Sequence, residues 1–205
     1  MLTRHILSAA IAVALAPALA TAADGRIIVL IGPPAAGKST QADYLHKRYG
    51  LPVISADALI QANPQAFAKL KEFRVDDLEP HSDPILNQLF REKIKTLDLS
   101  KGMILDGYPA TKGHADFLVA LMKELGLVPE VKVFQLEVPD DVVRRRIKEA
   151  KTPAIDPNTF EQQLKDYRRE MGFVQIYFPN ATIHQVDATK KPAAVNKAIQ
   201  KILGK

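Results

Sequence analysis

The chain has 205 residues, of which 47% are apolar and 25% are charged, and its formal net charge is +5. These proportions are ordinary for a soluble globular protein. Because cysteine is absent, disulfide frameworks, cysteine-ligated zinc sites and thiol nucleophiles are excluded. Basic and acidic residues are interspersed, without the basic stripe and interleaved aromatics of polynucleotide-binding proteins, so a nucleic acid polymer is not an expected partner.

The first residues have the pattern of a secretory signal. A short basic start, Met1 to His5, precedes the apolar run Ile6 to Ala20, and small residues follow at the spacing that signal peptidase requires. We expect residues 1–22 to be a signal peptide and residues 23–205 to be one domain, periplasmic or secreted and not held in a membrane after cleavage. An uncleaved N-terminal anchor and a start site assigned too far upstream, which would make the protein cytoplasmic, are the alternatives.

After this segment, short apolar runs that predict strands alternate with longer helical patterns. The predicted strands are Arg26–Ile31, Leu51–Ser55, Gly102–Asp106, Val131–Val138 and Ala181–Val186. The predicted helices are Lys38–Tyr49, Asp83–Leu97, Thr111–Leu125, Pro139–Ala150, Thr159–Tyr177 and Pro192–Leu203. This alternation predicts an α/β fold of three layers, in which a five-stranded parallel sheet carries helices on both faces.

One stretch does not follow the alternation. The residues from Ala56 to Pro84 favour helix, are interrupted by prolines and contain no strand pattern. We expect a small helical insertion here, over the carboxyl edge of the sheet where ligands of open α/β folds bind.

The strongest motif follows the first predicted strand. Residues 32–39 read GPPAAGKS, a complete G-x-x-x-x-G-K-S between a strand and a helix. Backbone N–H groups of such a loop surround a polyphosphate, and the helix N-terminus adds a partial positive charge. Lys38 is expected to reach the terminal phosphates, and the Ser39 hydroxyl is expected to ligate Mg²⁺, with Thr40 as a further phosphate contact.

A second carboxylate for the metal is expected at Asp106. This residue ends the apolar strand Gly102–Asp106, where an acidic side chain can hold a metal-bound water. An aspartate at a strand end is often only a turn former, and it is the pairing with the phosphate loop that favours the metal role.

Three segments, in order along the chain, resemble the adenylate kinase family of nucleoside monophosphate kinases. They are Gly32–Asp43 (GPPAAGKSTQAD), Leu105–Pro109 (LDGYP) with Thr111, and Leu136–Ile147 (LEVPDDVVRRRI). The resemblance covers essentially the whole chain after the predicted signal. It implies the P-loop nucleoside-kinase fold, Mg²⁺ and ATP as cofactors, small nucleotides as ligands, a monomer, and phosphoryl transfer from ATP to AMP or another nucleoside monophosphate.

The resemblance also implies roles for individual residues. Lys38 and Arg146 are the implied catalytic residues. ATP would contact Gly32, Pro33, Ala35, Ala36, Gly37, Lys38, Ser39, Thr40 and Arg146. The acceptor would contact Ser55, Asp57, Gly107, Tyr108 and His114. Residues 56–84 would form the monophosphate-binding insertion, and residues 147–158 a short lid.

Two of these acceptor positions have a second interpretation. Tyr108 replaces a phenylalanine of the family pattern, which favours a packing role with a polar tip. His114 replaces a glutamine, and it is either an acceptor contact or an exposed helix histidine.

Several family arginines are absent. Ile60 and Ala110 occupy positions of arginines that clamp the acceptor, and the lid arginines have no aligned counterpart. Lys148, Lys151, Arg168 and Arg169 are the nearby cations that could substitute. A P-loop kinase with another small acceptor, or a catalytically weak nucleotide-binding protein, therefore remain alternatives.

Overall fold

The computed structural model describes residues 25–65, 84–127, 130–149, 157–177 and 182–204. The predicted signal peptide, most of the predicted insertion and most of the predicted lid lie outside these residues. Within the described residues, no helix is long and apolar enough to cross a membrane.

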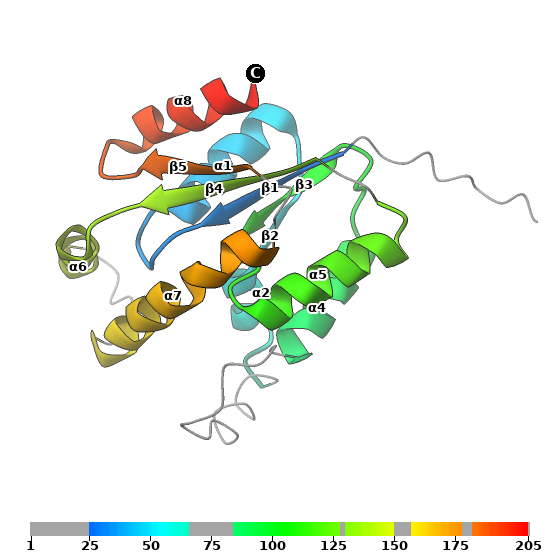
Figure 1. Ribbon diagram of the computed structural model, residues 1–205, viewed down its shortest axis with the longest axis horizontal. Coiled ribbons are helices and arrows are strands. Elements are labelled where there is room, and N and C mark those ends of the chain that lie inside the picture. The colour runs from blue at the N-terminus through cyan, green and yellow to red at the C-terminus, as the bar shows by residue number, and fades with distance from the viewer. Residues whose placement is uncertain (1–24, 66–83, 128–129, 150–156, 178–181, 205) are drawn as a thin grey trace, which may run out of the picture.

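The described residues form one parallel sheet of five strands, as predicted. The strands are β1 (Arg26–Ile31), β2 (Val53–Ser55), β3 (Gly102–Asp106), β4 (Glu130–Glu137) and β5 (Thr182–Asp187), in the order β2-β3-β1-β4-β5. Every pair is parallel, and β1 pairs with β3 on one side and β4 on the other. Parallel neighbours need crossover connections, which the helices between the strands provide (Figure 1).

Seven helices are described. They are α1 (Lys38–Tyr49), α2 (Ala56–Ala62), α4 (Pro84–Lys95), α5 (Lys112–Glu124), α6 (Asp140–Glu149), α7 (Pro157–Tyr177) and α8 (Pro192–Leu203). Figure 1 shows α1 and α8 above the sheet and α4, α5 and α7 below it. The described part of the predicted insertion contributes α2, and the insertion as a whole stays a prediction.

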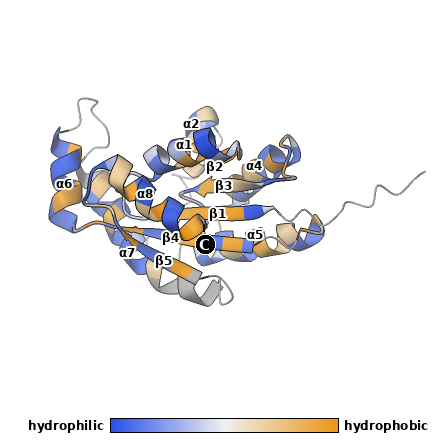
Figure 2. Cartoon of the chain, turned by 90° about the horizontal axis from the view of Figure 1, so that it is seen from above, coloured by the Kyte–Doolittle hydropathy of each residue, from blue (hydrophilic) through white to orange (hydrophobic). Residues whose placement is uncertain are grey.

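Two apolar cores, one on each face of the sheet, hold these layers together. Alternate residues of β1 enter opposite cores: Ile28 and Leu30 pack with α1 and α8, while Val29 packs with α4 and α5. All five residues of β1 after Arg26 are buried, as expected for a continuous apolar strand between two helical layers. Figure 2 shows β1 in orange, the colour of hydrophobic residues, over most of its length.

The ends of β1 and β3 are as predicted, and those of β2, β4 and β5 differ from the prediction by one or two residues, with a local cause at β2. Pro52 was expected inside this strand, but the strand begins at Val53. The Pro52 carbonyl still accepts a hydrogen bond from the Ile104 amide at 2.9 Å, whereas proline has no N–H to donate.

Candidate active site

The candidate site lies at the carboxyl edge of the sheet. Because all strands are parallel, the loop after β1, the end of β3 and the ends of β4 and β5 meet at this edge. The predicted phosphate loop, Asp106 and Arg146 therefore belong to one region, although more than 100 residues separate the first from the last.

In the phosphate loop, the lysine side chain contacts the backbone of the same loop. The Lys38 ammonium donates to the carbonyl oxygens of Gly32 and Pro33, at 3.1 Å each. The α1 helix begins after Gly37, which has no side chain to cap it, and its first turn contains no acidic residue. The positive end of this helix therefore has no protein carboxylate in its first turn and is available to an anion.

The two glycines of the motif are required for different structural reasons. A Cβ at Gly32 would lie 3.0 Å from the Leu136 carbonyl of β4, so the loop needs glycine to approach the strand. Gly37 has a φ of 95° and open space around it, so glycine is needed there for the backbone conformation. Ala35 also has a positive φ, 59°, which places strain of about 1 kcal/mol in the loop.

Lys38 and Asp106 perturb each other beside this loop. Burial lowers the pKa of Lys38, opposed by the negative charges of Asp106 and then Asp57. Burial raises the pKa of Asp106, opposed by hydrogen bonds from Ser39 and Ser55 and by the charge of Lys38. Burial thus disfavours the charged forms of both residues. A phosphate bound beside Lys38 would favour its positive charge, and a cation bound beside Asp106 would favour its negative charge.

Ser39 and Asp106 fit a magnesium site. The Ser39 hydroxyl hydrogen-bonds the Asp106 carboxylate, so two oxygen donors of the kind that Mg²⁺ prefers are adjacent. Among the described residues, no three histidine, cysteine or acidic side chains converge. A metal held here would take its remaining ligands from phosphate and water, as Mg²⁺ usually does.

Arg146 joins the phosphate loop to the end of β5. Its guanidinium donates to the carbonyls of Ala35 at 3.2 Å and Ala36 at 3.5 Å, and to that of Ala188 at 2.6 Å. The predicted ATP-binding arginine is therefore beside the phosphate loop, and three backbone carbonyls fix its orientation.

Three of the predicted acceptor residues line the neighbouring edge. Ser55 caps α2, accepting a hydrogen bond from the Ala58 amide at 3.4 Å, and Asp57 is exposed in the first turn of that helix. Gly107 follows β3, and a Cβ there would lie 3.7 Å from Cε of Lys38. The acceptor element therefore adjoins the donor loop.

Tyr108 and His114 each had two interpretations from the sequence, and their burial bears on both. Both are buried, at 0% and 4% exposure, so His114 is not an exposed helix histidine and the structure gives neither side chain an open face toward an acceptor. The Tyr108 hydroxyl donates to Asn87 of α4 at 2.6 Å, and its ring packs against Phe90 with centroids 4.1 Å apart. Tyr108 is thus the packing residue with a polar tip.

His114 supports the turn that carries the acceptor element. Its Nδ1 accepts a hydrogen bond from the Ala110 amide at 3.3 Å, while its buried Nε2 has no hydrogen-bond partner among the described residues. Burial lowers the pKa of His114 to about 4, so the ring is neutral at pH 7. Because Nδ1 accepts, the proton of the neutral ring is on Nε2.

The four cations that could substitute for the missing lid arginines do not lie together. Lys148 is exposed on α6, Lys151 lies outside the described residues, and Arg169 pairs with Asp166 at 3.1 Å on α7. Of the three that the structure describes, only Arg168 lines the cavity at the carboxyl edge of the sheet.

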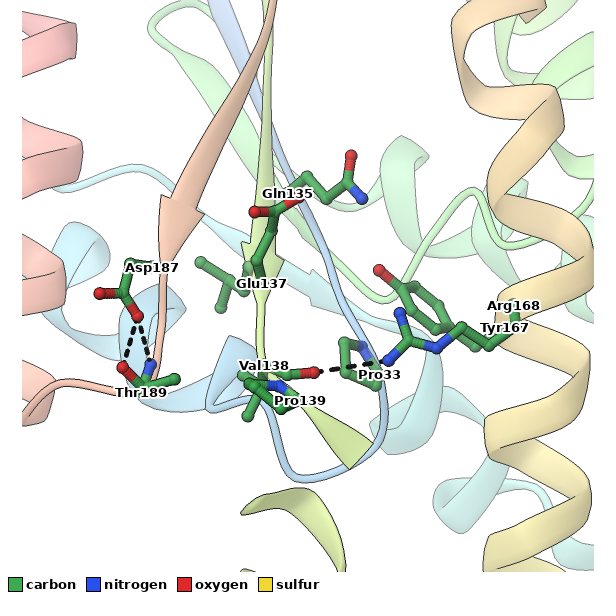
Figure 3. A pocket seen from close by; sticks show the side chains of 10 residues that line it. Pro33, Gln135, Glu137, Val138, Pro139, Tyr167, Arg168, Asp187 and Thr189 are labelled. Atoms are coloured by element: carbon green, nitrogen blue, oxygen red, sulfur yellow. Dashed lines mark hydrogen bonds between the residues drawn. The ribbon is translucent and has the colours of Figure 1, made fainter. Parts of the chain in front are cut away.

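This cavity has a volume of about 400 Å³, and most of the residues that line it were not predicted from the sequence. The residues that line it, many of them labelled in Figure 3, are Pro33, Gln135, Leu136, Glu137, Val138, Pro139, Tyr167, Arg168, Asp187 and Thr189. Pro33 and Arg168 were named from the sequence, whereas Gln135, Tyr167, Asp187 and Thr189 were not. Their position in the sequence could have indicated them, because Gln135 and Asp187 are near the carboxyl ends of parallel strands, where ligands of such folds bind.

Comparison with known proteins agrees with this geometry. Residues 30–183 match the family model described as adenylate kinase. The chain is 31% identical to the adenylate kinase of Agrobacterium fabrum, in an alignment covering 87% of this chain and 97% of that protein. The chain belongs to the adenylate kinase family. Membership confirms the predicted fold and supports nucleotide binding and a phosphotransferase activity of the nucleoside monophosphate kinase class.

Other adenylate kinases give the same result. That of Rhizobium meliloti is 32% identical, covering 86% of this chain and 98% of the relative. That of Methanosarcina barkeri reaches 40% identity over a shorter part, 58% of this chain and 57% of the relative. The adenylate kinase likeness therefore extends over most of the chain, beyond the phosphate loop.

Proposed function

We propose that this protein transfers the γ-phosphoryl group of Mg·ATP directly to a nucleoside monophosphate, with AMP as the leading acceptor. The observation that carries the proposal is the contact between the two elements of the site. Gly107 of the acceptor element lies beside Lys38 of the phosphate loop, so donor and acceptor would meet over one lysine. Phosphoryl transfer depends chiefly on such positioning and on cations around the transferring group.

The proposed step needs no covalent intermediate. A phosphate oxygen of the monophosphate forms a bond to the γ-phosphorus as the bond from that phosphorus to the bridging oxygen breaks. The electron pair of the broken bond stays on the β-phosphate of ADP, and the acceptor becomes a diphosphate. Bound Mg²⁺ would supply charge neutralisation, with Ser39 as a ligand and Asp106 holding it through water.

Within this step, the residues of the chain position and neutralise. Lys38 would leave the Gly32 and Pro33 carbonyls for the phosphate oxygens, where its charge is better compensated. Arg146 would hold the loop against the segment after β5. Ser55, Asp57 and Gly107 form the acceptor side next to the loop.

A different small acceptor is the second candidate, because of two specific positions. Ile60 is half-buried against the apolar core, and Ala110 exposes a methyl group where the family pattern has arginines. Neither side chain can hold the acceptor's phosphate as a guanidinium does. A kinase acting on another small hydroxyl or phosphate compound would have no need of these arginines.

The acceptor can be identified with the chain from Ala23 onward. ADP formation from Mg·ATP would be measured with AMP, CMP, UMP, GMP and dAMP. We expect ADP formation with at least one monophosphate, and a fall of about 100-fold or more in Lys38→Ala. Lys47→Ala, at an exposed lysine of the same helix, is the matched control and should keep its activity.

Other outcomes would separate the candidates. ADP formation with sugars or other small hydroxyl compounds, but with none of the monophosphates, would favour the second candidate. Tight ATP binding without turnover on any acceptor would reject both kinase proposals in favour of a nucleotide-binding protein.

A further inference from the structure

We infer that Arg168 supplies the cation that contacts the transferring phosphoryl group and thereby takes the place of the missing lid arginines. This inference rests on the proposed function. It starts from a shortage of positive charge. Phosphoryl transfer needs cations around the moving group, and removing one arginine of this kind costs orders of magnitude in rate. Positions 60 and 110 hold Ile60 and Ala110, so the acceptor side contributes no arginine there.

The cavity beside the phosphate loop contains one suitable group. Among the described residues that line it, Arg168 alone has a positive charge, and Pro33 of the phosphate loop forms part of the same wall. Figure 3 shows the Arg168 guanidinium directed from α7 toward Pro33 and the Val138 carbonyl. Arg168 is therefore directed toward the loop at which the terminal phosphate of ATP would bind.

Three contacts hold the Arg168 side chain in this direction. Its Nη2 donates to the Val138 carbonyl at 3.4 Å and also to the Asp140 carboxylate. Its guanidinium carbon lies 5.5 Å from the centre of the Tyr167 ring, a distance at which a cation and an aromatic face attract. Asp140 is in the first turn of α6, where the helix dipole already favours its negative charge.

These contacts leave donors free for a ligand. A guanidinium has five N–H donors, and both of the hydrogen bonds that Arg168 makes to described residues come from Nη2. Its side chain is 49% exposed, so the Nε and Nη1 donors can reach an anion in the cavity. Each of these charged N–H groups can donate a hydrogen bond to a phosphate oxygen, and hydrogen bonds from a charged donor are stronger than those between neutral groups.

The acidic residues of the cavity favour the same placement. Asp187 accepts hydrogen bonds from the Thr189 amide and hydroxyl and pairs with Lys190 at 3.4 Å, on the β5 side. Glu137 is exposed at the end of β4. Repulsion from these two carboxylates would direct a phosphate toward the wall formed by Pro33 and Arg168.

The first test compares Arg168→Gln with a matched arginine. Arg144 also has a side chain that is 49% exposed and is paired with an acid, Glu161, at 2.7 Å, but it does not line the cavity. We expect Arg168→Gln to lower kcat at least 100-fold and to change the Kd of ATP less than threefold. Arg144→Gln should change neither by more than threefold.

Two further variants separate contact with the phosphoryl group from a structural role. Asp140→Asn removes the negative charge but keeps an oxygen that can accept the Arg168 hydrogen bond, and the Val138 and Tyr167 contacts remain, so the guanidinium should keep its direction and the activity should stay within threefold of the original. Arg168→Ala should recover part of its lost kcat when free guanidinium is added at millimolar concentration. If Arg168 only fastens α7 to α6, then Asp140→Asn will lose as much activity as Arg168→Gln, and guanidinium will restore nothing.

A binding measurement decides the inference even if the original chain turns over no monophosphate. Mg·ADP with aluminium fluoride mimics ADP and the transferring phosphoryl group. Arg168→Gln should weaken binding of this mixture at least tenfold while the Kd of ADP alone is unchanged. Equal binding by the original chain and Arg168→Gln would overturn the role of Arg168, whereas absent turnover by the original chain would count against the proposed function alone.

Discussion

Lys38 holds its charge in a half-buried position. Burial lowers its pKa, and the two carbonyl oxygens that it contacts, together with Asp106 and Asp57, compensate only in part. Asp106, 3% exposed, is in the complementary position, with its pKa raised by burial. Both groups are therefore prepared for ligands of opposite charge, and perturbed groups of this kind at the edge of a parallel sheet are typical of active sites.

His114 makes the stability of the fold depend on pH. Its folded-state pKa of about 4 lies below the ordinary value of 6.5, so the unfolded chain takes up a proton that the folded chain refuses. Stability should therefore be lost as pH falls from 6.5 toward 4, by up to about 3 kcal/mol. We expect His114→Gln to lose less stability than the original chain between pH 7 and pH 4.5, as measured by urea unfolding.

The control for this experiment is His46→Gln, at an exposed histidine of α1. Its ring contacts the Leu51 carbonyl at 2.7 Å and not the buried turn at Ala110, so His46→Gln should keep the acid sensitivity that the buried His114 causes. If His114→Gln has the same pH dependence as the original chain, the neutral buried histidine is not the cause of the acid sensitivity.

At this scale, local spacing predicted the loop but not the contacts with residues from other elements. The spacing of Gly32, Gly37, Lys38 and Ser39 was sufficient to place them in one loop between a strand and a helix, and their contacts with phosphate and metal stay predictions. It was not sufficient for His114, whose burial depends on the ring of Tyr108, six residues earlier, and on Phe90 of α4. Those contacts arise only when α4 and α5 pack on the same face of the sheet.

At the scale of elements, the pairing of β1 with β3 depends on one glycine. Gly102 has a φ of 103°, and a Cβ at this position would lie 2.0 Å from the Arg26 carbonyl. Gly102→Ala should therefore lower the free energy of unfolding by about 4 kcal/mol or prevent folding. Gly126 has a φ of 66° with nothing within 4 Å, so Gly126→Ala should cost only about 1 kcal/mol.

The free energies of unfolding of the two variants, measured by chemical denaturation, would show how much of the loss at Gly102 exceeds the cost of a positive φ alone. Gly126 has a φ that alanine can adopt at a cost, whereas the φ of 103° at Gly102 lies beyond that region, so the difference between the variants measures the close approach at β3 together with this added backbone cost. Equal losses in the two variants would contradict a tight contact between Gly102 and Arg26.

The elements themselves were predictable because each face of the sheet is covered. Continuous apolar runs such as Ile27 to Ile31 predicted strands buried on both sides, and every predicted strand and helix is present with ends shifted by at most a few residues. The cavity was not predictable in the same way. Arg168 and Pro33 are 135 positions apart, and their approach depends on where α7 lies beside the end of β4.

At the scale of the whole molecule, we propose that the chain is exported and cleaved. The basic start and apolar run of residues 1–20, followed by small residues, support this proposal. Expression of the full chain in a bacterium with a periplasm should give a product in the periplasmic fraction whose mass begins at Ala23. A full-length product in the cytoplasm would contradict export, without bearing on the activity.

The central claim is direct transfer from ATP to a nucleoside monophosphate, and the fate of the γ-phosphate tests it most directly. ATP labelled at the γ-phosphate would be incubated with Mg²⁺, the accepted monophosphate and the chain from Ala23. The account predicts that the label enters the β-position of the newly formed diphosphate, one for each ATP consumed, with none on the protein. Label released as inorganic phosphate, or held covalently by the protein, would contradict it.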